Sequence, residues 1–184
     1  EASSDLSFRE PTKKENGRTG TITRWKPDLD VFTDIAVPRE HLENVLKKQS
    51  IVNPGTKFIF RWENEDGTFA EEEYYYENGI LDYVTETAGE TAETKPVLFH
   101  LETKGRDRDD MKDYKLQADI AFCTSKTVHM LEYYHCASHL EHGGSPERAV
   151  KTAFTYAVDR FLKAQGKYNN NESKITFADI EDCL

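Results

Sequence analysis

The chain has 184 residues, of which 37% are hydrophobic and 32% are charged, and its aromatic side chains are 2 Trp, 9 Tyr and 10 Phe. This length suits one large domain or two small ones, and so many aromatic side chains argue against a disordered chain. The formal net charge of −10 argues against a primary role as a free binder of nucleic acid or of acidic membranes. The longest apolar run covers only residues 120–123, so no transmembrane helix is predicted.

The three cysteines, Cys123, Cys136 and Cys183, are odd in number and widely spaced. A disulfide framework is therefore not expected, and a reducing, cytoplasmic location fits this pattern. The sequence starts at Glu1 rather than at Met and has no signal-type apolar stretch. We expect that it was cut out of a longer protein.

The N-terminal region is predicted to contain little regular structure. Residues 1–18 are polar and are interpreted as a lead-in segment. In residues 20–25, Ile22 alternates with polar neighbours, which predicts a half-buried strand. Pro27 and Asp28 are expected to end that strand.

The middle of the chain alternates between helical and extended patterns. An apolar stripe of helical period predicts a helix over residues 38–49. Apolar residues at every second position predict strands at 58–62 and 68–76, joined by a hairpin turn at 64–67. A short helix is predicted to follow over residues 80–89.

The C-terminal half begins with a second group of strands. Alternating apolar residues predict strands at 97–101 and 114–122, and the nearly all-charged residues 104–113 between them suit an exposed hairpin tip. Residues 128–134 are predicted to form a further strand that pairs back onto the second of these.

A long helix is predicted at residues 146–164. Ser145 offers a capping hydroxyl, and Pro146 suits the first turn. Phe154, Ala157 and Phe161 lie on one stripe of this helix and are expected to face the sheet. Strand groups followed by helices on one face of the sheet predict a two-layer α+β domain.

Most signatures of catalysis are missing from the sequence. It contains neither of the two glycine-rich phosphate-binding motifs nor the Gly-x-Ser-x-Gly motif of hydrolases. The acidic run 107–110 offers oxygen ligands for a divalent cation, but a solvated charged turn is the preferred interpretation. Tyr74, Tyr75 and Tyr76 could suggest base stacking, but consecutive strand residues point to opposite faces, and the acidic residues 71–73 beside them would repel phosphate.

Soft metal ligands concentrate in residues 135–142. Cys136, His139 and His142 follow at intervals of three, beside His135, and zinc accepts such donors. A structural zinc site needs four ligands at other spacings, so histidines that bond to the local backbone are the favoured interpretation. A small zinc-binding protein or metalloenzyme nevertheless stays open as an alternative.

Four segments resemble the transducer domain in the ATPase (B) subunit of bacterial type IIA DNA topoisomerases, the family of gyrase B and topoisomerase IV B. The first is TGTITRWKPDLDVF at 19–32, similar to the family's Gly-Thr-x-apolar-x-aromatic-x-Pro-Asp opening. The second is YENGILDYV at 76–84, similar to Tyr-Glu-Gly-Gly-Ile-x-x-Phe-Val. The others are GGS at 143–145 and FADIEDCL at 177–184. The segments follow the family's order and indicate a divergent member.

The resemblance implies a fold like domain 2 of ribosomal protein S5, a mixed sheet with helices on one face. It divides the chain into the lead-in at 1–18, a remnant of the preceding ATPase domain, and a transducer domain at 19–184. The family's nucleotide-binding domain would precede Glu1, and its ATP-sensing Lys loop would follow Leu184. We therefore expect no catalytic, cofactor-binding or metal-binding residue in this chain.

For the full-length protein, the resemblance implies an ATP-hydrolysing topoisomerase that uses Mg²⁺, and its B subunit is expected to form a homodimer with ATP. It would act on duplex DNA with a gyrase A or topoisomerase IV A partner. The domain would relay the ATP state toward DNA strand passage. Arg148, Lys151 and Arg160 on the long helix are the candidates to face DNA. An independent S5-like binding module is the alternative, although the net charge of −10 disfavours RNA binding.

Overall fold

The computed structural model describes residues 12, 17, 19–169, 171, 173–182 and 184. The chain divides into two compact units, Glu1–Val37 and Pro38–Leu184. Most of the predicted lead-in at 1–18 lies outside the described residues.

The first unit contains no strand among its described residues, so the strand predicted at 20–25 is wrong. Ile22 is 97% exposed. A strand is stabilised by hydrogen bonds to the backbone of a neighbouring strand. An alternating sequence does not by itself provide that neighbour. The stop after it is confirmed, because the Asp28 carboxylate accepts a hydrogen bond from the Asp30 backbone N–H at 2.9 Å.

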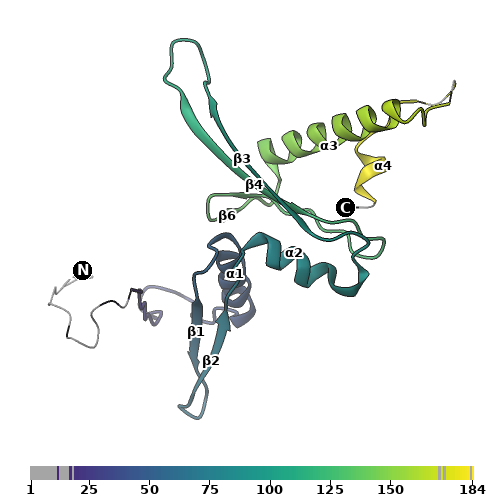
Figure 1. The fold of residues 1–184 in the computed structure, drawn as a ribbon. Coiled ribbons are helices and arrows are strands. Elements are labelled where there is room, and N and C mark those ends of the chain that lie inside the picture. The colour runs from purple at the N-terminus through teal and green to yellow at the C-terminus, as the bar shows by residue number, and fades with distance from the viewer. Residues whose placement is uncertain (1–11, 13–16, 18, 170, 172, 183) are drawn as a thin grey trace. The chain divides into compact units, whose positions relative to one another are not determined.

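The second unit contains all of the regular elements that the structure describes (Figure 1). In chain order they are α1 (Arg39–Val52), β1 (Phe58–Glu63), β2 (Phe69–Tyr74), α2 (Ile80–Ala88), the 3₁₀ turn η1 (Gly89–Thr91), β3 (Val97–Gly105), β4 (Tyr114–Phe122), β5 (Tyr134–His135), β6 (Ser138–His139), α3 (Gly144–Ala164) and α4 (Ala178–Glu181). The helices and hairpins predicted at 38–49, 58–76, 80–89 and 97–122 are therefore confirmed, with boundaries shifted by a few residues.

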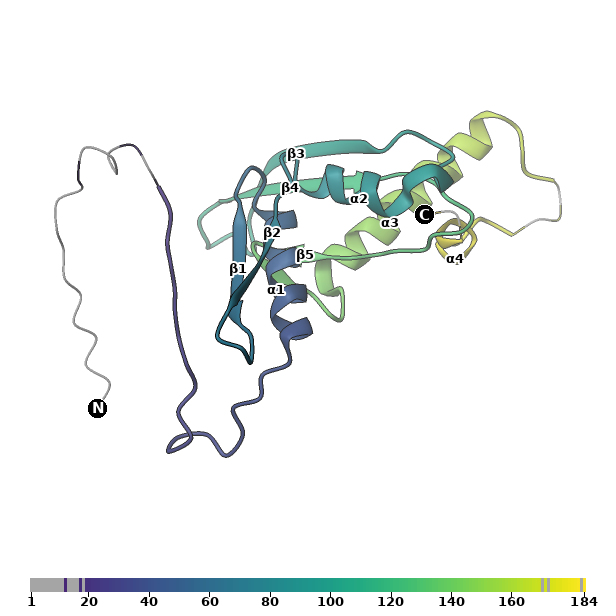
Figure 2. The same cartoon turned by 90° about the horizontal axis from the view of Figure 1, so that it is seen from below.

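The first hairpin, β1–β2, has one covered face. Phe58, Phe60 and Trp62 are half-buried, whereas the intervening residues are exposed, as the alternation predicts. Helix α1 lies against this hairpin (Figure 2) and places the Arg39 guanidinium 3.5 Å from the centre of the Trp62 ring. This contact combines cation–π attraction with burial of the Arg39 stem.

The second hairpin, β3–β4, extends away from the helices around it (Figure 1). Its register pairs Val97 with Phe122 and Gly105 with Tyr114. The predicted tip is confirmed as a charged turn, and both of its arginines form ion pairs within it. Arg106 bonds to Asp113 at 2.7 Å, and Arg108 lies 3.4 Å from Asp110.

The α+β class is confirmed, but the strands in the described part of the chain form three separate antiparallel pairs, β1–β2, β3–β4 and β5–β6. The expected single mixed sheet is therefore not found there. The strand predicted at 128–134 is wrong, because only Tyr134 at its end belongs to a strand. The Ser125 hydroxyl instead accepts hydrogen bonds from the backbone N–H groups of Thr127 and Val128. This turn leads the chain away from β4.

Deep burial is concentrated where α1, α2 and the loop after β2 meet. The buried hydrophobic residues of the described chain are Ile51, Tyr76, Ala88 and, in α4, Ile180. No helix within the described ranges is long and apolar enough to cross a membrane.

Candidate interaction site on helix α3

Helix α3 starts one residue earlier than Ser145. Gly143 precedes it with φ +63°, and no side chain caps its first turn, so the predicted capping role of Ser145 is wrong. Glu147 folds back onto Gly143 instead, so closely that a Cβ atom at Gly143 would lie 2.4 Å from the carboxylate. An acidic group at this end favours the helix through its dipole.

One side of α3 meets the second hairpin through a single aromatic contact. The Phe154 ring packs edge to face on the Phe122 ring of β4, with centroids 5.2 Å apart. Phe154 therefore faces the sheet as predicted. Ala157 and Phe161 do not, because both are exposed, Phe161 to 61%. A helix of this length extends about 30 Å, which is more than a two-stranded ribbon covers.

The chain folds back along another side of α3 after the helix ends at Ala164, and the predicted stop at Gly166 follows with φ +60°. The Tyr168 hydroxyl donates to Asp159 at 2.8 Å and accepts from the Ile175 backbone N–H at 3.2 Å. Further on, the Phe177 ring lies 5.3 Å from the Lys151 ammonium. Both views place α4 beside α3 (Figures 1 and 2). These contacts anchor the C-terminal segment to the helix at two points.

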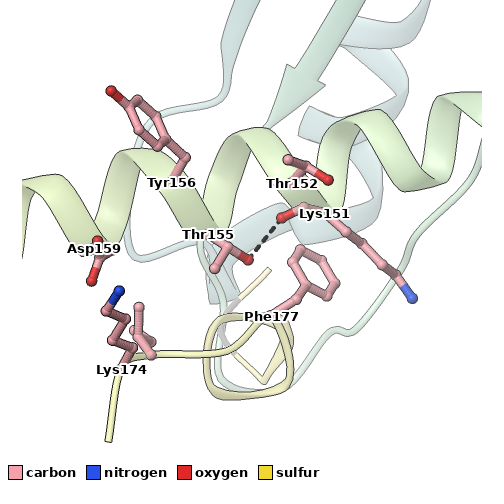
Figure 3. Close-up of a pocket in the computed structure, with 8 residues that line it drawn as sticks. Lys151, Thr152, Thr155, Tyr156, Asp159, Lys174 and Phe177 are labelled. Atoms are coloured by element: carbon pink, nitrogen blue, oxygen red, sulfur yellow. Dashed lines mark hydrogen bonds between the residues drawn. The ribbon is translucent and has the colours of Figure 1, made fainter.

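A shallow groove of about 450 Å³ lies between α3 and this segment (Figure 3). Its lining consists of Lys151, Thr152, Thr155, Tyr156, Asp159, Lys174, Ile175 and Phe177. Figure 3 shows the Lys174 ammonium beside Asp159 and the Phe177 ring beside the Lys151 stem. The groove therefore combines an aromatic wall with charged groups along its length.

The charges of the groove are largely balanced within the domain. The Lys151 ammonium lies 2.8 Å from Glu147, and that hydrogen bond raises the pKa of Lys151. Lys163 bonds to Asp159 at 2.5 Å, and together with the Tyr168 hydroxyl it lowers the pKa of Asp159. The Lys151 ammonium and the Asp159 carboxylate are therefore charged at neutral pH. Such a surface suits a mixed-charge partner better than a bare anion.

The three candidates to face DNA do not converge on one side of the helix. Arg148 and Arg160 are exposed, and neither forms an ion pair with any residue that the structure describes. Lys151 is half-buried and paired. Lys151 and Arg160 are nine positions apart, which is two and a half helical turns at about 3.6 residues per turn, so they lie on opposite sides.

The soft-ligand segment forms the short β5–β6 hairpin rather than a ligand cage. Cys136 is exposed at its turn with φ +52°, and His139 packs against the ring of Tyr134 at 5.3 Å. Over the described ranges, neither this segment nor the acidic tip at 107–110 contains three side chains arranged to hold a metal ion. The zinc alternative therefore gains no support from the geometry.

Sequence reasoning missed most of the groove. Thr152, Thr155, Tyr156 and Asp159 follow Lys151 at helical spacing, so this polar stripe was visible in the sequence. Lys174 gave no such signal. Its place beside Asp159 depends on the chain folding back through Tyr168.

The fold defines an α+β domain with a shallow groove of mixed charge beside α3. A family model described as DNA gyrase B matches residues 79–184, from the start of α2 to the end of the chain. The match covers more than half of the sequence, and the chain therefore belongs to the DNA gyrase B family.

Individual relatives agree with the family match. The chain is 27% identical over 171 residues to the DNA gyrase B protein of Staphylococcus aureus strain MRSA252, covering 91% of this chain and 25% of that protein. It is 22% identical over 173 residues to the DNA gyrase B protein of Streptococcus pneumoniae, covering 92% of this chain and 25% of that protein. The chain thus spans about a quarter of the length of these curated relatives. Identity at this level agrees with the divergence that the resemblance indicated.

Proposed function

We propose that this domain is a transducer of an ATP-dependent type IIA DNA topoisomerase. In this role it relays ATP binding and hydrolysis from a nucleotide-binding domain to DNA strand passage. The observation that carries the proposal is the family match over residues 79–184, which includes α2, the β3–β4 hairpin and α3. The S5-like architecture and a cytoplasmic location belong to the same proposal.

The mechanical part of the proposal rests on the contacts of α3. The helix packs on β4 through Phe154 and Phe122, and it is tied to the C-terminal segment through Asp159 and Tyr168. A helix held on two sides transmits displacement from one side to the other, because packed elements do not deform continuously.

The remaining parts of the proposal concern the whole protein. ATP and Mg²⁺ are its cofactors, duplex DNA is its substrate, and the gyrase A or topoisomerase IV A protein is its partner, with the gyrase B-like chain forming a homodimer. This domain supplies neither the nucleotide site nor the catalytic residues. The sequence agrees with that division, since it contains neither of the two glycine-rich phosphate-binding motifs.

Calorimetric titration with a non-hydrolysable ATP analogue tests this division. The 184-residue chain is expected to give no heat of binding, whereas the full-length protein, as the positive control, binds the analogue. Micromolar binding by the chain itself would overturn the proposal, because the nucleotide site would then lie within the supposed relay.

A further inference from the structure

A glutamate carboxylate in the segment between β4 and α3 contacts helix α2. Glu132 lies in this segment, and both of its oxygens contact tyrosine hydroxyls. Tyr134 donates to Oε2 at 2.6 Å, and Tyr83 of α2 donates to Oε1 at 3.5 Å. The first is a short, charge-assisted bond, and the second is a long contact at the limit of hydrogen bonding.

The same contacts continue into α1. Tyr83 meets Tyr76 edge to face, with ring centroids 6.1 Å apart. The Tyr76 hydroxyl donates to Glu86 at 2.7 Å, and Glu86 lies 3.5 Å from the Lys47 ammonium of α1. Helices α1 and α2 are thereby linked to one another before the contact with Glu132.

The contacts of Tyr134, the other partner of Glu132, continue toward α3. Tyr134 packs on His139 across the β5–β6 pair, and the Leu140 backbone N–H donates to the Tyr133 carbonyl at 2.8 Å. Only a few residues then separate Leu140 from the start of α3 at Gly144. Glu132 is thus one side chain through which the helices contact the lead into α3, and Gln49 of α1 is another, because its amide donates to the Ala137 carbonyl at 2.7 Å.

We infer that Tyr83, Glu132 and Tyr134 form a joint that makes the α1–α2 pair and the lead into α3 open and close together. As a route for the relay, this inference rests on the proposed function. As a mechanical joint, it stands independently of nucleotide and DNA. Of the two hydrogen bonds to Glu132, the one from Tyr83 is longer and weaker than the one from Tyr134. The joint is therefore expected to separate first between Tyr83 and Glu132.

The two tyrosine hydroxyls of the joint stay protonated at physiological pH. Burial, followed by the nearby Glu132 carboxylate, raises the pKa of Tyr83 and of Tyr134. Both hydroxyls therefore keep their protons and remain donors over the physiological range.

Native-state hydrogen exchange on the whole 184-residue chain tests the joint. The reporters are the Tyr83 amide, bonded to the Gly79 carbonyl within α2, and the Leu140 amide in the lead. The variants are Tyr83→Phe and Glu132→Gln, each of which preserves side-chain size. Tyr133→Phe is the matched control, because the Tyr133 hydroxyl is buried without a hydrogen-bond partner among the described residues.

We expect cross-effects between the two elements. Tyr83→Phe should raise exchange at Leu140 about fivefold, and Glu132→Gln should raise it at Tyr83 by a similar factor, the loss expected for one hydrogen bond. The double variant should exchange no faster than the faster single variant, because Tyr83→Phe by itself already removes the contact between residues 83 and 132.

Two results would overturn the joint. In one, each substitution changes exchange only in its own element. In the other, Tyr133→Phe produces the same changes as Tyr83→Phe. Either result leaves the transducer proposal standing, because that proposal is tested separately by nucleotide titration.

Discussion

The backbone carbonyl oxygen of Ile51 approaches Gly79 so closely that a Cβ atom at Gly79 would lie 2.8 Å from it. Gly79 also has φ +58°, in the left-handed region that side chains other than glycine rarely adopt. This residue therefore lets the chain turn from β2 into α2 while the end of α1 packs against the turn.

Gly79→Ala is expected to lower the free energy of unfolding by about 3 kcal/mol, of which about 1 kcal/mol is left-handed strain. Gly67→Ala is the control, because Gly67 has φ +79° but open space around it. It should lose only the strain component, about 1 kcal/mol. Equal losses in denaturant titration would show that the contact with Ile51 contributes nothing.

Phe154→Ala should lower the free energy of unfolding by about 2 kcal/mol, roughly half the cost of removing a fully buried Phe ring, because Phe154 is half-buried. Phe161→Ala should change it by less than about 0.5 kcal/mol, because Phe161 is 61% exposed. Thermal unfolding of both variants provides the comparison. If Phe161→Ala costs as much as Phe154→Ala, the side of α3 assigned to β4 is wrong.

His100 is expected to titrate above its ordinary pKa of 6.5, because its ring nitrogen bonds to Asp119 at 2.6 Å. A raised folded-state pKa stabilises the fold below the unfolded pKa, and this contribution is lost as pH rises through the folded pKa. Asp119→Asn should lower the pKa of His100, as followed by NMR, whereas Asp107→Asn in the hairpin tip should not. An unchanged His100 titration in Asp119→Asn would contradict the assignment.

Binding of duplex DNA by the chain is expected to be weak and steeply dependent on salt, because its net charge is −10. Arg148→Ala should weaken binding more than Lys151→Ala, since Lys151 is already paired with Glu147. A phosphate contact by Arg148 should contribute about one unit to the salt slope. Tight, salt-insensitive binding in a filter assay would contradict this expectation.

The local elements were largely predictable from the sequence, because their signals are local. The β1–β2 turn is one example. Asp66 accepts hydrogen bonds from both the backbone N–H and the hydroxyl of Thr68, and Gly67 takes a positive φ. Turn residues of this kind act within a few positions of the chain.

The predictions that were wrong concern structure that depends on residues far away in the sequence. Alternation at residues 20–25 and 128–134 fits a strand, but the ladder also needs a neighbouring backbone. The stripe through Phe154 and Phe161 likewise fits a buried helix face, yet only Phe154 has a ring from β4 against it. The groove beside α3 was missed because it forms only after the chain folds back through Tyr168.

The most direct test of the relay compares Phe154→Ala with Phe161→Ala in the full-length protein. Nucleotide affinity and ATP-driven strand passage are measured side by side for each variant. We predict that Phe154→Ala binds nucleotide like the parent protein but loses strand passage, whereas Phe161→Ala retains both. Intact strand passage in Phe154→Ala would contradict the claim that α3 relays the ATP state through its contact with β4.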